Sequence, residues 1–185
     1  MNDQKKILGF VGDLAAGKGT VCKYLKEKYG INSYRYSTAL RDVLKRLYLP
    51  ETRDNMQRLS TSLRETLGQD LISKIIAEDV SRDAGQIVAV EGIRRFSDIT
   101  YLEKNPGFNL TYITADPKIR WERLVNRGEN PDDAHKTFEQ FLEDEQKESD
   151  HGIKEVGQTA KLIIRNDGNF EELKKQIDQL IGELK

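Results

Sequence analysis

One glycine-rich segment constrains the fold of this chain more than any other feature. Residues 12–20 read Gly-Asp-Leu-Ala-Ala-Gly-Lys-Gly-Thr, directly after the apolar run Ile7–Val11 and directly before a segment with helical spacing. A chain that turns sharply from a buried strand into a helix needs residues without a β-carbon, which Gly12 and Gly17 supply. The start of such a helix offers unpaired N–H groups and partial positive charge. The segment therefore predicts a loop that wraps a phosphate group.

The lysine in this segment indicates a polyphosphate. Lys18 would place its ammonium between the β- and γ-phosphates of ATP as a point charge. The general pattern has Ser or Thr directly after the lysine, whereas this chain has Gly19 there and Thr20 one residue later. That shift leaves open whether the Thr20 hydroxyl binds magnesium. The residues expected to contact the nucleotide are Gly12, Asp13, Ala15, Ala16, Gly17, Lys18, Gly19 and Thr20. The alternative is a glycine-rich turn that only packs a strand against a helix.

Short apolar runs alternate with helical segments along the whole chain. The runs are Ile7–Val11, Ile87–Val90, Leu110–Ile113, Leu162–Ile164 and, more weakly, Tyr34–Tyr36. Nearly continuous apolar runs are typical of strands buried on both faces. Their alternation with helices implies parallel crossovers. The sequence therefore predicts an α/β fold of three layers, with a parallel five-stranded sheet, in one domain over residues 1–185.

Composition and charge narrow the classes of function. With 30 Lys and Arg against 31 Asp and Glu, the formal net charge of −1 provides no global field that would attract nucleic acid. Neither a membrane span nor a signal peptide is expected, because the apolar runs are too short. A single cysteine, Cys22, and two histidines allow no internal disulfide or metal cluster, so a reducing cytoplasm is the expected location. The oligomeric state cannot be read from the sequence.

Two segments are too polar to be helices that only cover a sheet. One runs from about Pro50 to Arg64, and the other, Arg127 to Gly152, is rich in Asp, Glu and Lys. They are either solvated helices, as runs of charge usually are, or two mobile flaps over a site.

The Gly-Lys-Gly-Thr form of the loop resembles that of nucleoside monophosphate kinases of the adenylate kinase type, and the resemblance covers nearly the whole chain. It implies a P-loop kinase fold with ATP and Mg²⁺ as ligands. It also implies an acceptor-binding helical insert at about residues 37–80 and a small lid at about residues 127–152.

The resemblance supplies candidates for the acceptor site. Residues 37–41, Ser-Thr-Ala-Leu-Arg, look like the start of the acceptor-binding helix, more as in deoxynucleoside monophosphate kinases than in adenylate kinases. It implies that Thr38 and Arg41 meet the acceptor phosphate. Arg53 and Arg64 could also face the acceptor, or could equally be surface residues.

A second motif, Val-Glu-Gly-Ile-Arg-Arg at residues 90–95, is similar to the Asp-Gly-Phe-Pro-Arg segment of adenylate kinases. Glu91 would stand at the end of a central strand, where open α/β sheets bind ligands, and could hold magnesium through water. Of the two arginines, Arg94 is favoured to reach the acceptor phosphate, with Arg95 the alternative. A surface salt bridge is the competing interpretation for each.

The predicted helix after Asp116-Pro117 carries Arg120, Arg123 and Arg127 on one face. The resemblance implies that Arg123 stacks on the adenine and Arg127 contacts phosphate, with Arg120 outside the contact set. Lids of this family usually return further arginines, but residues 128–161 contain none. Either Lys147 substitutes, or the lid closes with less neutralisation of charge. The turn at residues 166–168 is expected to pack near the adenine through backbone groups.

The resemblance implies an ATP-dependent kinase that phosphorylates a small phosphorylated acceptor, with a (deoxy)nucleoside monophosphate as the preferred candidate. Lys18, Arg94 and Arg127 would carry the reaction. One alternative is a dephospho-CoA kinase-like enzyme, which would need a carboxylate after the second strand, where Ser37 and Thr38 stand. Asp13 could then serve as base, or could only cap the turn. Another alternative is a regulatory module that binds ATP and transfers nothing.

Overall fold

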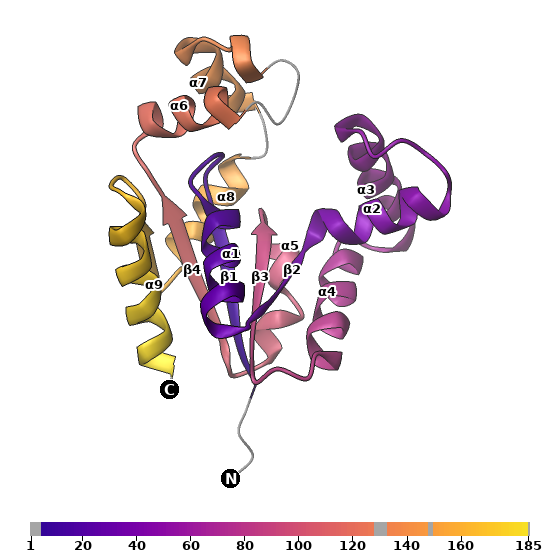
Figure 1. The fold of residues 1–185 in the computed structure, drawn as a ribbon. Coiled ribbons are helices and arrows are strands. Elements are labelled where there is room, and N and C mark those ends of the chain that lie inside the picture. The colour runs from indigo at the N-terminus through magenta and orange to yellow at the C-terminus, as the bar shows by residue number, and fades with distance from the viewer. Residues whose placement is uncertain (1–4, 128–132, 148–149, 185) are drawn as a thin grey trace.

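A five-stranded parallel sheet organises the protein (Figure 1). The structure is a computed structural model that describes residues 5–127, 133–147 and 150–184. The strands are β1 (Lys6–Gly12), β2 (Asn32–Arg35), β3 (Ile87–Ile93), β4 (Phe108–Thr114) and β5 (Leu162–Arg165). They lie in the order β2-β3-β1-β4-β5, and every neighbouring pair is parallel. The predicted α/β class and five-stranded sheet are confirmed. The weakest of the five runs lies slightly earlier than expected, because Tyr36 already begins a helix.

Helices cover both faces of this sheet and extend beyond its carboxyl edge. The α-helices are α1 (Lys18–Tyr29), α2 (Tyr36–Arg46), α3 (Arg53–Leu67), α4 (Leu71–Arg82), α5 (Phe96–Ile99), α6 (Pro117–Arg127), α7 (Phe138–Lys147), α8 (Asp150–Gln158) and α9 (Phe170–Leu184). Two short 3-10 helices are η1 (Leu102–Lys104) and η2 (Asp133–His135). No helix in the described ranges is long and apolar enough to span a membrane.

The side chains of the central strand β1 show why the sheet has a helical layer on each face. Leu8 and Phe10 belong to an apolar cluster with α1 and α9. Ile7 and Val11 belong to a second cluster with α4 and α8. Successive residues of a strand point to opposite faces, so a continuous apolar run fills both layers. The three-layer arrangement follows from this alternation.

Two helical groups stand beyond the carboxyl edge of the sheet, α2 with α3 on one side and α6 with α7 on the other (Figure 1). Helix α4 lies within the predicted acceptor insert of residues 37–80, yet Ile72, Ile76 and Val80 place it in the core beside β3. The part of that segment that projects from the core is therefore α2 and α3. The predicted lid of residues 127–152 contains η2 and α7, while residues 128–132 and 148–149 lie outside the described residues.

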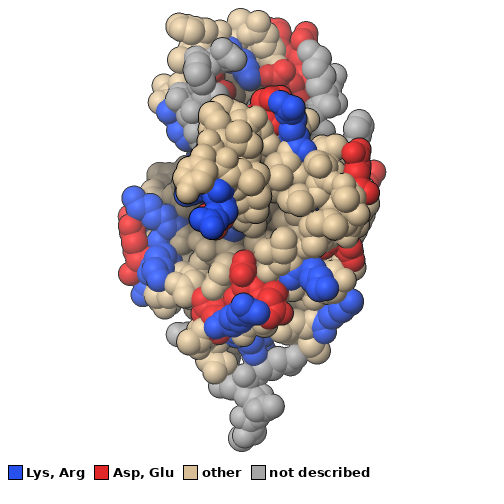
Figure 2. Space-filling view, turned by 90° about the vertical axis from the view of Figure 1, so that its right-hand side faces the viewer, with Lys and Arg blue, Asp and Glu red and all other residues tan. Residues whose placement is uncertain are grey.

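Charged side chains of both signs are interspersed on the face formed by α2 to α4. Figure 2 views the protein from this side and shows small mixed groups of Lys, Arg, Asp and Glu around broad uncharged areas. The near-zero net charge is thus distributed on this face without a large patch of one sign.

Gly12 lies where the chain leaves the sheet, and it has no room for a side chain. A β-carbon at Gly12 would lie 2.2 Å from the backbone oxygen of Ile113 in β4. Gly12 and Ile113 are register partners, so the contact is between two strand backbones and cannot be relieved by rotating a side chain. The close approach fixes the starting point of the loop against β4.

This contact predicts opposite effects for two glycine substitutions. Gly12→Ala should lower the free energy of unfolding by about 1–3 kcal/mol, because the strand backbones must separate. Gly182→Ala, on the exposed side of α9 where a β-carbon meets nothing within 4 Å, should raise it by about 0.5–1 kcal/mol through helix propensity. Urea unfolding of both variants measures the difference, and equal stability of the two would contradict the steric argument.

Candidate nucleotide-binding site

The loop between β1 and α1 has the backbone conformation that a phosphate cradle requires. Ala15 and Gly17 have positive φ angles of 57° and 102°, and the Ala16 amide donates to the Asp13 oxygen at 3.2 Å. A β-carbon at Gly17 would lie 2.4 Å from the side-chain nitrogen of Asn166. Glycine is thus required at Gly17 by both conformation and space.

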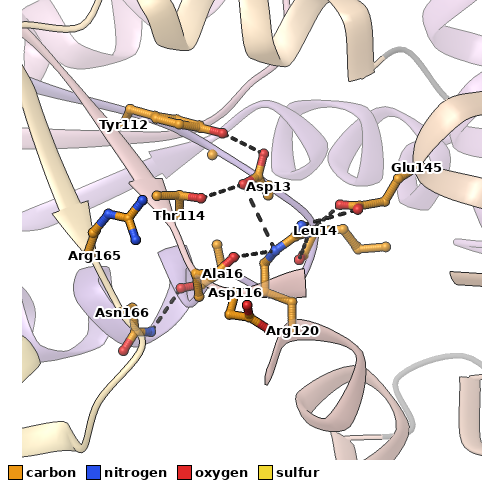
Figure 3. Close-up of polar contacts among 12 residues, drawn as sticks. Asp13, Leu14, Ala16, Tyr112, Thr114, Asp116, Arg120, Glu145, Arg165 and Asn166 are labelled. Atoms are coloured by element: carbon orange, nitrogen blue, oxygen red, sulfur yellow. Dashed lines mark hydrogen bonds and ion pairs between the residues drawn. The ribbon is translucent and has the colours of Figure 1, made fainter. Parts of the chain in front are cut away.

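Asn166 braces this loop from the end of β5. Its side-chain amide donates to the Ala16 oxygen at 2.9 Å, while its own backbone amide donates to Thr114 at 2.8 Å (Figure 3). The turn at residues 166–168 was expected to contribute mainly backbone groups near the adenine. The structure shows in addition a side-chain bond to the loop, which the turn signal in the sequence did not specify.

Asp13 anchors the loop to β4. Its carboxylate accepts hydrogen bonds from the hydroxyls of Tyr112 at 2.8 Å and Thr114 at 2.7 Å (Figure 3). Burial and the hydrogen bond to Asp13 raise the pKa of Tyr112 to about 12. Both carboxylate oxygens of the buried Asp13 therefore have donors, and in this structure the side chain holds the loop in place.

Arg120 lies against the loop, although the sequence analysis placed it outside the nucleotide contacts. The residue is only 4% exposed. Its guanidinium donates to the backbone oxygens of Ala115 at 2.9 Å and Leu14 at 3.3 Å, and its Nε lies 4.0 Å from Asp13. The remaining partner is Glu145 of α7, which forms a two-pronged ion pair with it (Figure 3). The acidic partner of this arginine thus comes from a helix 25 residues away, a distance at which the sequence gives no signal.

The other two arginines of α6 are placed differently. Arg123 is partly buried, and its Nη1 has no hydrogen-bond partner among the described residues. Arg127 is exposed at the end of the helix. Lys147 ends α7, but its side chain lies outside the described part of the structure. Adenine stacking by Arg123 and phosphate contacts by Arg127 or Lys147 remain predictions.

Lys18 bends back over the mouth of the loop. Its ammonium donates to the backbone oxygens of Gly12 at 2.6 Å and Asp13 at 2.8 Å. Burial, and secondarily the positive charge of Arg94, lower the pKa of Lys18 to about 8, against the opposing influence of Asp13 and Glu91. The ammonium is therefore poorly solvated in the free protein and would gain from an anion. Gly19 and Thr20 are exposed in the first turn of α1, so the Thr20 hydroxyl remains a predicted ligand only.

Glu91 ends up next to a residue that the sequence analysis overlooked. It is 6% exposed, and its carboxylate accepts a hydrogen bond from Arg35 Nη2 at 2.6 Å. Arg35 is the last residue of β2 and the register partner of Glu91. In the sequence Arg35 stands in a weak strand with no motif around it. Only the pairing of β2 with β3 shows that the two charges meet.

The site fits a magnesium ion that is held mainly by phosphates and water. Among the described residues no group of three or more His, Cys, Asp or Glu side chains could ligate a metal. Glu91 provides one buried carboxylate whose charge reaches Lys18. A single carboxylate together with substrate phosphates is a usual environment for Mg²⁺.

Arg94 and Arg95 follow β3 on a loop held by Asp98. Their backbone amides donate to Asp98 Oδ2 at 2.9 and 3.2 Å, and both side chains are exposed. The positive charge of Arg94 contributes to lowering the pKa of Lys18. The preference for Arg94 over Arg95 as the residue that faces the acceptor stays a prediction.

Arg64 differs from its expected role as an acceptor ligand. Its Nη2 forms a buried ion pair with Asp98 at 2.9 Å, and its Nη1 donates to the Gln69 oxygen at 2.6 Å. In this structure Arg64 therefore supports the Arg94–Arg95 loop through Asp98. Arg53 begins α3, but its side chain lies outside the part of the protein that the structure describes.

The two candidates on α2 remain accessible to the site. Thr38 is exposed in the first turns of α2. Arg41 forms an ion pair at 3.4 Å with Glu51, and both side chains are partly exposed. Such a pair is weak and can exchange its partner, so the expected contact with an acceptor phosphate is compatible with this arrangement.

Comparison with known proteins places this geometry in a family. Residues 11–140 match the model of a protein family described as an AAA domain. A UPF0200 protein of Pyrococcus furiosus is 32% identical over 181 residues, covering 95% of this chain and 96% of the relative. A UPF0200 protein of Sulfurisphaera tokodaii is 30% identical with the same shares of each chain covered. These names state no substrate.

Two solved structures share the fold of the chain. The protein TT1252 from Thermus thermophilus superposes with a TM-score of 0.66 at 19% identity, covering 98% of this chain and 99% of that one. Shikimate kinase from Bacteroides thetaiotaomicron superposes with a TM-score of 0.65 at 13% identity, covering 97% and 98%. At these identities the likeness is one of fold.

The Arg120–Glu145 pair predicts that α7 stabilises the loop. Glu145→Gln should lower the free energy of unfolding by about 1–3 kcal/mol, because it leaves the buried guanidinium with the more distant Asp13 as its remaining counter-charge. Glu139→Gln removes a carboxylate from the exposed first turn of the same helix and serves as the control. Urea unfolding of both variants provides the test. A Glu145→Gln protein as stable as the control would show that the ion pair contributes nothing.

The lowered pKa of Lys18 predicts that nucleotide binding depends on pH. A bound triphosphate favours the charged ammonium and raises this pKa above its value of about 8 in the free protein. Binding above that pH then takes up a proton, so the Kd of ATP should increase by up to about tenfold per pH unit. Titration calorimetry from about pH 7 to about pH 9.5 measures the trend, with Lys18→Met as the variant that should lack it. A wild-type Kd that stays constant over this range would rule out a contribution of Lys18.

Proposed function

This chain belongs to the family described as an AAA domain, groups with the UPF0200 proteins and has the fold of a P-loop kinase; on that basis we propose that it transfers the γ-phosphate of ATP to a small phosphorylated acceptor. The acceptor class that we propose, on the resemblance of residues 12–20 and 90–95 to nucleoside monophosphate kinases, is a (deoxy)nucleoside monophosphate. The observation that carries this proposal is the crowding of charged groups at the loop. The positive charges of Arg94 and Arg120 and the negative charges of Asp13 and Glu91 all act on the pKa of Lys18, whose ammonium lies on the Gly12 and Asp13 oxygens.

The nucleotide side of the site is the loop with Lys18. The ammonium now bonded to the oxygens of Gly12 and Asp13 would turn to the β- and γ-phosphates. The backbone amides of the first turn of α1, which begins at Lys18, provide further donors. Because Asp13, Arg120 and Asn166 hold the loop, little reorganisation is needed when the nucleotide arrives. Arg123 and Arg127 complete this side by stacking on the adenine and neutralising phosphate charge.

The acceptor side is formed by the carboxyl end of β3 and by α2. Arg94 orients the acceptor phosphate toward the γ-phosphate, with Thr38 and Arg41 approaching from α2. Asp98 fixes the backbone of Arg94, and Arg64 fixes Asp98. The acceptor would thus lie between the two helical groups that stand beyond the sheet (Figure 1).

The reaction asks for positioning and for stabilisation of charge. An oxygen of the acceptor phosphate forms a bond to the γ-phosphorus, the bond to the β–γ bridging oxygen breaks, and ADP leaves with the electron pair. An ionised phosphate is already nucleophilic near neutral pH, so the chain needs no general base. Mg²⁺, when bound by the nucleotide and through water by Glu91, supplies charge neutralisation at the β- and γ-phosphates. Lys18, Arg94 and Arg127 supply the remaining positive charge.

An assay of ADP release tests the proposal directly. Purified protein is incubated with ATP and Mg²⁺, alone and with each ribo- and deoxynucleoside 5′-monophosphate. We expect stimulation of ADP release by at least one monophosphate and a matching diphosphate product. Stimulation by dephospho-CoA alone would identify a hydroxyl as the acceptor instead. ATP binding without stimulation by any acceptor would point to a regulatory module.

Lys18→Ala examines the same proposal at one residue. We expect the rate of transfer to fall by about three orders of magnitude or more, because one charge-assisted contact to the transferred group is lost. The fold should persist, since Lys18 in the free protein bonds only to loop carbonyls. Circular dichroism confirms folding, and turnover of the variant within tenfold of the wild type would remove Lys18 from the mechanism.

A further inference from the structure

We propose that Arg35, at the end of β2, binds the phosphate of the acceptor and thereby selects a phosphorylated substrate. This inference rests on the proposed function and assigns a specificity-determining contact within it. Arg35 lies outside the sequence motifs at residues 12–20, 37–41 and 90–95. Its position, its available donors and the charges around it support this role.

The position of Arg35 lies at the centre of the site. It is the register partner of Glu91 on the neighbouring strand, and the next residue, Tyr36, begins α2. The Tyr36 hydroxyl donates to the backbone oxygen of Asp98, which ties the end of β2 to the loop that carries Arg94. The two arginines therefore follow adjacent parallel strands at the same edge of the sheet, where ligands of such folds bind.

The Arg35 guanidinium lies beside the first turn of α1. A β-carbon at Gly19 would lie 3.4 Å from Arg35 Nη2, at an ordinary van der Waals distance. A Ser or Thr at this position would place its hydroxyl group in this region or push the arginine aside. The absence of a side chain at Gly19 leaves the space above the start of α1 to the guanidinium. Gly19 and the Arg35 guanidinium therefore lie side by side at the start of α1.

The guanidinium has donors to spare. A guanidinium carries five N–H donors in a planar fork. Glu91 is the only hydrogen-bond acceptor of Arg35 among the described residues, and the Arg35 side chain is 47% exposed. The Glu91 carboxylate, by contrast, is buried, with 8% of its side chain exposed. Nη2 of the fork therefore neutralises a buried charge, while about half of the side chain is exposed and the remaining donors are available for phosphate.

The geometry favours the acceptor over ATP as the ligand. Strand β3 lies between β2 and β1 in the sheet, so Arg35 belongs to a strand that does not adjoin the loop strand, although its Nη2 reaches the start of α1. It leads directly into α2, the helix that carries Thr38 and Arg41. An acceptor phosphate between Arg35 and Arg94 would receive two guanidinium groups from the body of the protein. Such a pair compensates for the lack of arginine in residues 128–161.

The positive charge of Arg35 favours a phosphorylated acceptor over one that reacts through a hydroxyl. A kinase that activates a hydroxyl benefits from a carboxylate near the attacking oxygen, since the proton must be removed. Here the second strand ends in a guanidinium, which attracts an anion and cannot itself act as a general base. The end of β2 therefore favours a phosphate monoester as the acceptor.

The test compares ligands that differ by one phosphate. Titration calorimetry gives the Kd of each nucleoside 5′-monophosphate and of the corresponding nucleoside for the wild type and for Arg35→Met. We expect the preference of the wild type for the monophosphate to decrease about tenfold to a hundredfold in Arg35→Met, as loss of a charge-assisted contact predicts. Arg35→Lys should restore part of it. The Kd of a non-hydrolysable ATP analogue should change less than about threefold.

Two further variants keep the result interpretable. Arg35→Met leaves the Glu91 carboxylate buried without its partner, which lowers the stability of the single variant. The double variant Arg35→Met/Glu91→Gln removes both charges and is therefore measured in parallel. Arg82→Met breaks an exposed ion pair with Glu78 at the end of α4 and should leave all these constants unchanged. Urea unfolding confirms that each variant is folded under the conditions of titration.

The outcomes separate this inference from the proposed function. A wild-type preference for monophosphate that persists in Arg35→Met and in the double variant would overturn the role of Arg35 alone. A loss of affinity for the ATP analogue with that preference intact would assign the guanidinium to the nucleotide and overturn it equally. A wild type that neither prefers monophosphates nor releases ADP in their presence would overturn the proposed function itself, and this inference with it.

Discussion

The fastening of the glycine-rich loop to the ends of neighbouring strands is the constraint on which the rest of the site depends. Asp13 accepts hydrogen bonds from two hydroxyls of β4, and Asn166 reaches the loop from the end of β5. The conformation of Ala15, with its positive φ, is held because these contacts fix the residues before and after it, Asp13 and Ala16. The parallel sheet matters to function chiefly because it brings these strand ends to one edge.

Buried charges connect this loop to both helical groups beyond the sheet. Arg120 joins the loop to α7 through Glu145, and Arg35 joins Glu91 of β3 to the start of α2. Each pair contains a nearly buried member, whose charge would be costly without its partner. Electrostatic neutrality thus couples the loop to α7 and β3 to the start of α2.

Local patterns in the sequence were sufficient to predict the fold and the glycine-rich turn between β1 and α1. The apolar run of β1 indicates a strand buried on both faces, and Gly12 and Gly17 indicate a tight turn after it. Both features depend on adjacent residues alone, and the predicted five-stranded sheet is confirmed. The pairings of charges could not be read in this way. Arg64 meets Asp98 across 34 residues and Arg35 meets Glu91 across 56, so their roles depend on strand order and helix placement. The sequence shows which residues can carry charge at the site, while the fold decides which charges neutralise one another.

The position of Arg120 at the root of α6 has a mechanical consequence. Its guanidinium contacts Leu14 in the loop on one side and Glu145 in α7 on the other. A rotation of α7 away from α6 would remove the Glu145 carboxylate and leave the guanidinium with Asp13, 4.0 Å from its Nε, while it remains in contact with the loop backbone. A bound anion could then take the place of the carboxylate. Ligand occupancy and the tilt of α7 would therefore be linked reciprocally, each altering the free energy of the other through one shared side chain.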